Sequence, residues 1–242
     1  MLMRACPGLP ADEPADFKSA SFDTLLLHAQ RDGTTPAKRE NRKLAREEIF
    51  ARGGQSLDYF VGHAHIRNLW VHILIEQLVN RLEKQEAVPV LLPYLESKHE
   101  RTRKTAAFYL GFFDAPEHAA RVLPLLHDEE TAGAAARTLG KWRVEEAVPQ
   151  VLRILKDEKE RRRVIAANAL GEIGDASAVP SLIEALGDPI FTVRKCAARA
   201  LLAIGEPARS PLEAAAPSAG ATARREIESV LAALDSRKTQ DP

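Results

Sequence analysis

Net charge is the first thing this sequence lacks. Its 34 lysines and arginines are balanced by 34 aspartates and glutamates, so the formal net charge at pH 7 is +0. A chain without an excess of one sign is not attracted as a whole to nucleic acid or to an anionic membrane. A charged patch on one face is still compatible with this balance, because the two signs can be segregated on the folded surface.

Cysteine is also scarce. Cys6 and Cys196 are the only two in 242 residues, which is too few for a disulfide-stabilised scaffold. We expect both thiols to be reduced, as is usual in the cytosol. The opening residues, MLMRACPGLPADEP, contain no apolar core of the kind found in signal peptides. The sequence therefore predicts a cytoplasmic protein.

Long apolar runs and catalytic motifs are absent as well. The most apolar stretch, Leu69 to Val79, contains His72 and Glu76 and is too short to span a bilayer. The chain has no glycine-rich phosphate loop and no G-x-S-x-G nucleophile motif. We therefore predict no membrane partner, no cofactor and no enzymatic activity.

What the sequence does contain is a repeat. Four alanine pairs each precede a leucine by three or four residues, and these leucines are 29, 31 and 31 residues apart. A period near thirty with two apolar stretches is typical of stacked helical hairpins, so we predict an all-α solenoid. The pairs and leucines are Ala106-Ala107 and Leu110, Ala135-Ala136 and Leu139, Ala166-Ala167 and Leu170, and Ala197-Ala198 and Leu201.

Three further positions keep the same phase. An aspartate or serine is expected to cap each second helix, a proline to open each first helix, and an arginine to pair with the aspartate of a neighbouring repeat. The capping residues are Ser97, Asp128, Asp157 and Asp188. The prolines are Pro89, Pro149, Pro180 and Pro211. The arginines are Arg103, Arg163 and Arg194.

The segment RVIAANALGEIGDASAVPSLIEALGD, residues 163–188, resembles the short HEAT-like repeat of bacterial proteins, the type first named from phycobilisome lyases. The resemblance implies an α-solenoid (superhelix) with the second helices on its concave side. It implies no single activity, because relatives serve as scaffolds, lyase subunits, DNA-repair enzymes and hydroxylases.

This resemblance and the flanking patterns predict five segments. Residues 1–35 are mostly disordered, 36–86 form a divergent N-terminal helical repeat, 87–205 form four HEAT-like repeats, 206–235 form a capping repeat and 236–242 are a tail. Individual helices are predicted over residues 21–29, 36–52, 66–82 and 222–234.

One face of the second helices concentrates positive charge. Residues spaced by four lie on the same helix face, and the stripe defined by positions 104, 108 and 112 and their equivalents holds five cations and a single acid, Glu172. We therefore expect a scaffold or adaptor that binds an acidic protein partner through this face, although a solvated polar face would give the same pattern. The candidate partner-binding residues are Lys104, Phe108, Phe112, Arg137, Lys141, Asn168, Lys195 and Arg199.

Other functions are less well supported by the residues. A bilin-lyase-like subunit is allowed by the resemblance, and nucleic-acid binding by the basic stripe. His63, His65 and His72 lack a carboxylate or cysteine at ligand spacing, so no metal site is predicted. Trp142 is in phase with apolar residues and is expected in the core, whereas Ile190-Phe191 is either an exposed pair or a hydrophobic staple.

Overall fold

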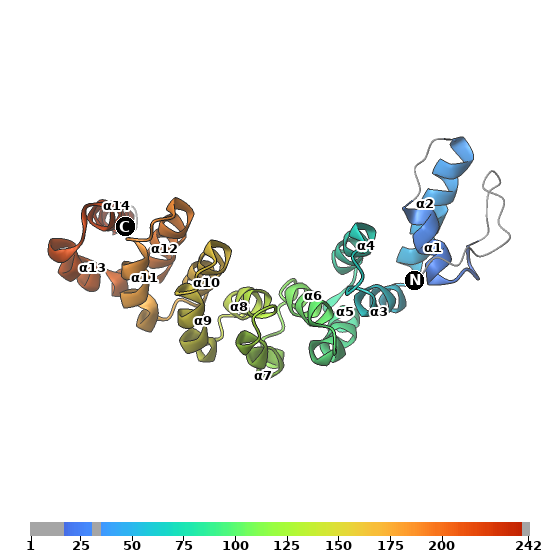
Figure 1. Ribbon diagram of the computed structural model, residues 1–242, viewed down its shortest axis with the longest axis horizontal. Helices are drawn as coiled ribbons and strands as arrows, with labels where there is room; N and C mark the ends of the chain where they lie inside the picture. The colour runs from blue at the N-terminus through green and yellow to red at the C-terminus, as the bar shows by residue number, and fades with distance from the viewer. Residues whose placement is uncertain (1–16, 31–34, 239–242) are drawn as a thin grey trace. The chain divides into compact units, whose positions relative to one another are not determined.

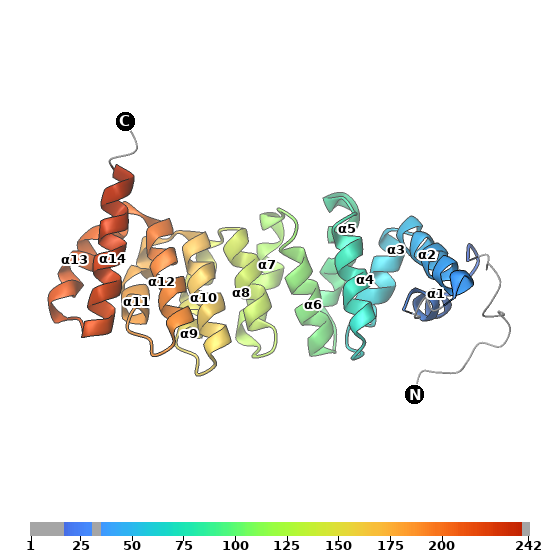
Figure 2. The same ribbon diagram turned by 90° about the horizontal axis from the view of Figure 1, so that it is seen from above.

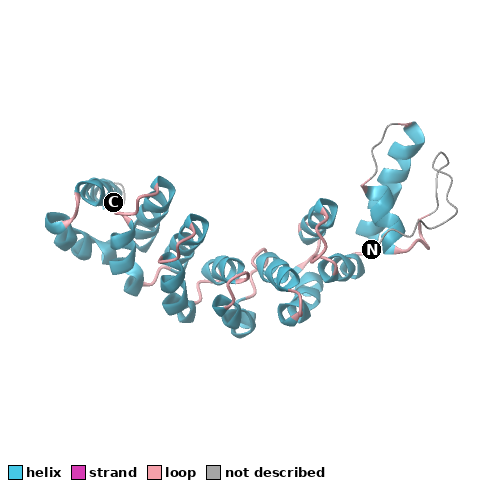
Figure 3. Ribbon diagram, viewed as in Figure 1, coloured by secondary structure: helices cyan, strands magenta, loops and turns pink. Residues whose placement is uncertain are grey.

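The computed structural model of the chain (Figure 1) describes residues 17–30 and 35–238. These residues form 14 α-helices joined by loops and 3₁₀ turns, and they contain no strand (Figure 3), which confirms the all-α prediction. The helices are α1 Phe22–Ala29, α2 Pro36–Ala51, α3 Gly54–Gly62, α4 Leu69–Val79, α5 Lys84–Leu91, α6 Glu100–Leu110, α7 Ala119–Val122, α8 Ala132–Lys141, α9 Val148–Leu155, α10 Glu160–Ile173, α11 Val179–Ala185, α12 Phe191–Ile204, α13 Arg209–Ala215 and α14 Ala221–Lys238.

The chain divides into two compact units, Met1–Thr102 and Arg103–Pro242. In the first unit, α1 packs on α2, and α3 packs on α4 and α5. Phe60 and Leu74 are among its fully buried side chains. Arg52 stabilises the position of residues 17–20, because its guanidinium donates to the carbonyls of Phe17 at 3.1 Å and Ala20 at 2.8 Å. Part of the segment predicted to be disordered is therefore structured, and its residues 1–16 and 31–34 lie outside the described part of the chain.

Three of the predicted helices in these regions have the expected places. The Ser21 hydroxyl caps α1 and the Thr35 hydroxyl caps α2, each accepting from a backbone N–H at 3.3 Å, and α14 covers residues 222–234. The helix predicted over 66–82 is shorter, Leu69–Val79, because Asn68 is extended and its side chain accepts from the Trp70 N–H at 2.9 Å. The predicted tail begins inside α14, and its residues 239–242 lie beyond the described chain.

The second unit is a stack of helical hairpins. Figures 1 and 2 show the second helices α8, α10, α12 and α14 running side by side, with α7, α9, α11 and α13 in the other layer. All four alanine pairs and their leucines are buried, as the repeat predicts. Glu228 and Ser229, which occupy the alanine positions in α14, are both exposed at this end of the stack.

Glycines set the closest approach of neighbouring second helices. A Cβ on Gly140 would lie 2.8 Å from the Ala169 Cα, and one on Gly171 would lie 2.7 Å from the Ala200 Cα. Real Cβ atoms do not come this close to a neighbouring backbone, so the packing requires glycine here. This close approach comes at the cost of helix propensity, because glycine is less favourable than alanine inside a helix.

Side-chain hydrogen bonds also join adjacent repeats. The Thr138 hydroxyl donates to the Ala107 carbonyl at 2.6 Å, and the Trp142 indole N–H donates to the Phe113 carbonyl at 2.7 Å. Trp142 is buried, which confirms its predicted place in the core. Because each bond crosses from one repeat to the next, these residues stabilise the stack rather than the individual hairpin.

The in-phase aspartates do not cap the second helices, contrary to the prediction. The Oδ1 atoms of Asp128, Asp157 and Asp188 accept from the backbone N–H two residues ahead, at 3.0, 2.8 and 2.8 Å, and the helix starts later. They form Asx turns in the loop, which compete with a helix cap for the same side chain. The Ser97 hydroxyl accepts from the His99 N–H in the same way at 3.3 Å.

Proline positions follow the prediction with one exception. Pro149 and Pro180 lie in the first turns of α9 and α11, and Pro211 is the third residue of α13. Pro89 instead lies inside α5, because this helix already begins at Lys84. The residues just before α9 and α11 form separate 3₁₀ turns, Glu145–Ala147 and Ala176–Ala178, so these two α-helices start closer to their prolines.

The arginines pair forward with the next repeat. Arg103 contacts Asp128 at 2.5 Å, and Arg163 makes a two-point contact with Asp188 at 2.8 and 3.1 Å. Arg194 has no such aspartate ahead of it; its guanidinium donates to the Asp188 carbonyl at 2.8 Å and lies 3.8 Å from Glu226. The pairing predicted between repeats is therefore present at two of the three positions.

The repeat that carries Ala132 in place of arginine uses a different contact. Arg162, from the following repeat, pairs with Asp157 at 2.8 Å and reaches back to the Glu129 carbonyl. The Glu129 carboxylate lies 3.1 Å from Arg162 and 2.5 Å from Lys159. At this junction Arg162 of the later repeat contacts the earlier repeat, whereas at the other junctions an arginine of the earlier repeat contacts the later one.

Candidate functional site

A groove of about 780 Å³ lies on the second-helix face of the C-terminal unit. Helices α8, α10 and α12 form it, and its side chains come from three successive repeats. We call it the α8–α10–α12 groove. It is lined by Arg137, Lys141, Arg143, Ile165, Asn168, Ala169, Gly171, Glu172, Ile173, Gly174, Arg199, Ala200 and Ala203.

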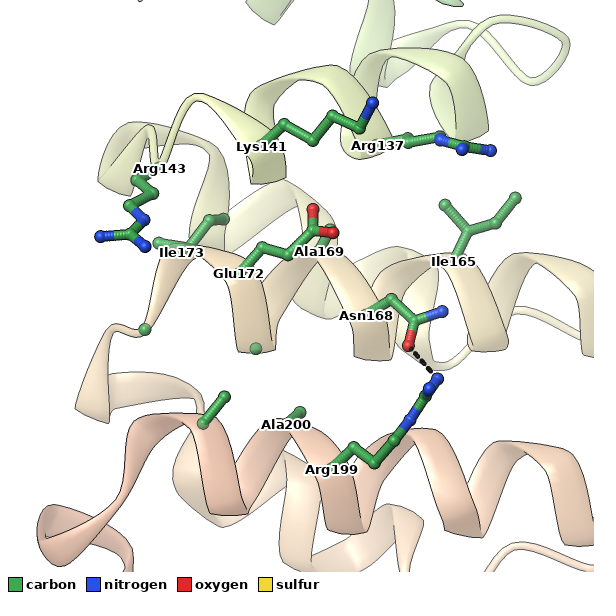
Figure 4. Close-up of a pocket in the computed structure, with 13 residues that line it drawn as sticks. Arg137, Lys141, Arg143, Ile165, Asn168, Ala169, Glu172, Ile173, Arg199 and Ala200 are labelled. Atoms are coloured by element: carbon green, nitrogen blue, oxygen red, sulfur yellow. Dashed lines mark hydrogen bonds between the residues drawn. The ribbon is translucent and has the colours of Figure 1, made fainter. Parts of the chain in front are cut away.

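The groove is strongly positive. Arg137, Lys141, Arg143 and Arg199 are exposed cations on its surface, and Glu172 is the single acidic residue in the lining. Figure 4 shows Arg137 and Lys141 projecting from α8, Glu172 from α10 and Arg199 from α12. Like charges gathered in a concave surface raise the local potential, so this groove favours anions on a chain of zero net charge.

Aromatic rings support the two cations of α8. The Arg137 guanidinium lies 4.9 Å from the centre of the Phe108 ring, and the Lys141 ammonium lies 5.0 Å from the Phe112 ring. The ammonium also donates to the Gly111 carbonyl at 2.8 Å. The two phenylalanine rings therefore restrain the positions of these cations. Phe112 nevertheless remains 39% exposed.

Asn168 and Arg199 form the link between α10 and α12. The Arg199 guanidinium donates to the Asn168 side-chain oxygen at 3.0 Å (Figure 4) and lies 3.4 Å from the Cys196 sulfur. An amide oxygen carries no charge, so this contact orients the arginine without neutralising it. Arg199 keeps its positive charge available to a ligand.

Ionisation in the groove reflects the crowding of its charges. Desolvation raises the pKa of the Glu172 carboxyl, while the nearby charges of Lys141 and Arg137 oppose that rise. Desolvation also lowers the pKa of Lys141, and the neighbouring Arg137 lowers it further. The site holds its cations close together with only one acid between them, which is the arrangement expected for an anion site.

Arg143 belongs to the groove but was missed by the sequence analysis. It follows α8 with φ = 54° and is the only non-glycine residue with positive φ among the described residues. The equivalent positions in the next two repeats are Gly174 and Gly205, whose φ values are 81° and 80°. The sequence did contain a signal for this residue, because Arg143 occupies a position at which the next two repeats have glycine. Left-handed backbone costs a non-glycine residue about 1–2 kcal/mol.

The other predicted cations are outside the groove lining. Lys104 lies 3.5 Å from Glu130, and Lys195 lies 3.2 Å from Glu226. Phe191, for which the sequence left two interpretations, is 57% exposed beside Lys195. Of the eight candidate residues, the structure thus brings Arg137, Lys141, Asn168 and Arg199 to one groove, with the two phenylalanines beneath the α8 cations.

Three histidines, His63, His65 and His99, take part in stacked ring pairs. His65 and His99 stack with ring centres 4.2 Å apart, and His63 stacks on Tyr59. Within the described ranges, no group of three or more histidine, cysteine or acidic side chains is arranged to hold a metal ion. No helix in residues 17–30 and 35–238 is long and apolar enough to cross a membrane.

Comparison with known proteins identifies the repeat. A family model of HEAT repeats matches residues 127–189 and residues 160–232. No curated protein matches the chain. An engineered protein of known structure aligns over 93% of this chain and 72% of its own, with 18% identity and a TM-score of 0.51.

Two further solved structures align with lower scores. The complex of CpcE and CpcF of phycocyanin lyase from a Nostoc species aligns over 95% of this chain and 99% of its own, with 16% identity and a TM-score of 0.47. A designed armadillo repeat protein aligns over 88% and 100%, with 17% identity and a TM-score of 0.47. The family model thus identifies HEAT repeats over residues 127–189 and 160–232 of the chain.

Proposed function

We propose that this protein is a HEAT-repeat adaptor whose α8–α10–α12 groove binds an acidic segment of a protein partner. One observation carries the proposal: four exposed cations from successive repeats line one groove that contains a single acidic residue. Arginine guanidinium groups form two-point hydrogen bonds with carboxylates. Ile165, which is half-buried in the lining, adds apolar surface for the side chains between the acidic ones.

Charge favours a protein ligand over nucleic acid. The lining provides four cations and one acid, whereas tight binding to nucleic acid usually neutralises about 6–10 phosphates. An acidic peptide needs only a few spaced carboxylates. The experiment measures fluorescence anisotropy of a labelled (Glu-Leu)5 peptide with the full chain, with (Lys-Leu)5 and a ten-nucleotide single-stranded DNA as comparisons.

The expected order of affinity follows from the charges and the apolar lining. The glutamate peptide should bind at least about tenfold more tightly than the lysine peptide, since a tenfold ratio requires only about 1.4 kcal/mol. If the DNA bound more tightly than the glutamate peptide and lost its affinity steeply with salt, the nucleic-acid alternative would replace this proposal.

Glu172 provides a test by removal of repulsion. Glu172→Gln keeps the size of the side chain and removes the one negative charge of the lining, so the affinity for the glutamate peptide should rise roughly threefold to fivefold, about the energy of one exposed charge pair. Anisotropy titrations of the two proteins measure the ratio. An unchanged or weaker affinity would mean that the peptide does not approach Glu172.

The raised pKa of Glu172 gives the unaltered protein a pH dependence that the Glu172→Gln variant should lack. A carboxyl with a raised pKa takes up its proton at a higher pH than an ordinary glutamate, so acidification neutralises it while Arg137, Lys141, Arg143 and Arg199 stay charged. Affinity of the unaltered protein should therefore increase as the pH is lowered from neutral, in the range where the glutamates of the peptide are still ionised. The Glu172→Gln protein should lose most of that increase.

Replacement of Arg143 with glycine should raise the stability of the protein and lower its affinity for the peptide. Arg143→Gly relieves the left-handed conformation at φ = 54°, so the melting temperature should rise by a few degrees, corresponding to about 1 kcal/mol. The same change removes a cation from the groove and should weaken peptide binding severalfold. Thermal melting and anisotropy measure the two effects. A variant that is more stable and binds equally well would place Arg143 outside the binding surface.

A further inference from the structure

A second basic cluster lies in the N-terminal unit, on α2 and just after α4. Four of its cations are on α2 at positions 39, 42, 43 and 46, a spacing that places them on one helix face. They line a pocket of about 360 Å³ together with Arg81, Phe50 and Glu47. The five cations are Arg39, Arg42, Lys43, Arg46 and Arg81.

Three of these cations have no acidic partner among the described residues. Lys43 is different, because it lies 3.9 Å from both Glu40 and Glu47, and Glu47 is the one acid in the pocket lining. Across residues 17–30 and 35–238, no carboxylate pairs with the guanidinium of Arg42, Arg46 or Arg81. The Nε atom of Arg46 is buried without a hydrogen-bond partner. Clustered cations that lack partners repel one another, and an anion in the pocket would relieve that repulsion.

Aromatic rings fix the position of two of these arginines. The Arg81 guanidinium lies 4.0 Å from the centre of the Phe50 ring, and that of Arg46 lies 5.2 Å from the Trp70 ring. Such stacking restrains the guanidinium groups before any ligand arrives. The Phe50 ring also provides an apolar wall inside the charged pocket.

We propose that this pocket binds a small organic phosphate, with the phosphate on Arg42, Arg46 and Arg81 and the organic part against Phe50. The planar fork of a guanidinium matches phosphate oxygens in two-point contacts. Three guanidinium groups that have no carboxylate partner within the described ranges suit a doubly charged phosphate better than a singly charged carboxylate. The volume of about 360 Å³ is within the range of small-molecule sites and exceeds that of a single phosphate.

Calorimetric titration of the full chain tests the proposal with three simple probes: phenyl phosphate, inorganic phosphate and benzoate. Phenyl phosphate should bind most tightly, because it alone combines two charges with an apolar ring. The Arg42→Gln/Arg81→Gln protein should bind it at least about tenfold more weakly, because it lacks two of the three guanidinium groups that contact the phosphate. Lys38→Gln, on the same helix but outside the pocket lining, should leave the affinity unchanged.

Several results would overturn the proposal. These are equal affinity for benzoate and phenyl phosphate, equal loss in the Lys38→Gln control, or binding of anionic vesicles or a phosphopeptide without binding of phenyl phosphate. If the double variant loses helical circular dichroism, Arg42→Lys replaces it; this variant keeps the charge but lacks the fork and should still bind more weakly. Arg137→Glu/Arg199→Glu should not affect this site, so the outcome is independent of the groove.

Discussion

Replacing Arg137 and Arg199 together with glutamate is expected to abolish binding of the acidic peptide while leaving the melting temperature nearly unchanged. Both side chains are exposed cations of the α8–α10–α12 groove. Each reversal removes one attraction and adds one repulsion, so the pair should cost about 2 kcal/mol or more of binding free energy, a loss of at least roughly thirtyfold.

Stability should change little because both arginine side chains are exposed and their contacts are with uncharged groups. Arg137 lies over Phe108, and Arg199 donates to the uncharged Asn168 side chain. Contacts of this kind contribute about 0.5–1 kcal/mol each at exposed sites. Thermal melting should therefore show a decrease of a few degrees at most.

A control for net charge is available in the same unit. Arg161 and Arg225 are exposed and lie outside the groove lining. Arg161→Glu/Arg225→Glu makes the same change in net charge and should keep nearly all of the affinity. Equal losses in the two double variants would show that the peptide responds to overall charge and would remove the groove from the proposal.

Gly171→Ala should destabilise the protein, although helix propensity alone predicts the opposite. Alanine is favoured over glycine inside a helix by about 1 kcal/mol. The added Cβ would, however, lie 2.7 Å from the Ala200 Cα and 2.9 Å from its Cβ. Helices α10 and α12 would have to separate, and overpacking of this kind costs about 1–3 kcal/mol. We expect a melting temperature several degrees lower.

Gly133→Ala is the matched comparison. A Cβ at this position would meet only the Ile165 Cδ1 atom, at 3.3 Å, and that is the flexible end of a side chain. This variant should be neutral or slightly more stable. If chemical or thermal unfolding showed Gly171→Ala as stable as Gly133→Ala, the glycines would not set the spacing of the second helices.

The sequence was informative wherever a feature recurred with the period of the repeat. The buried alanine pairs, the leucines and the face that carries Arg137, Lys141 and Arg199 all follow from the repeat spacing and helix geometry. These positions are determined by local helical structure and by the same packing in each repeat. Because each of these positions recurs in every repeat, one sequence provides several independent examples of the same pattern.

Other features do not follow from the repeat spacing and helix geometry alone. Lys195 is drawn to Glu226, an acid of the terminal helix that has no equivalent in the earlier repeats. The Asx turns displace the helix starts because side chain and backbone compete for the same N–H groups. Arg143 lies beyond the end of α8, where the spacing of helical residues no longer applies.

The forward arginine contacts have a consequence for how the array can be lengthened or shortened. Removing the repeat that contains Ala132 would bring Arg103 before Asp157, which keeps an arginine opposite an aspartate at the new junction. Removing the following repeat would instead bring Ala132 before Asp188 and leave that aspartate without the partner that Arg163 provides. The repeats are thus not interchangeable units: each junction is compatible with some neighbours and not with others, which restricts the order in which duplication or loss could have built this chain.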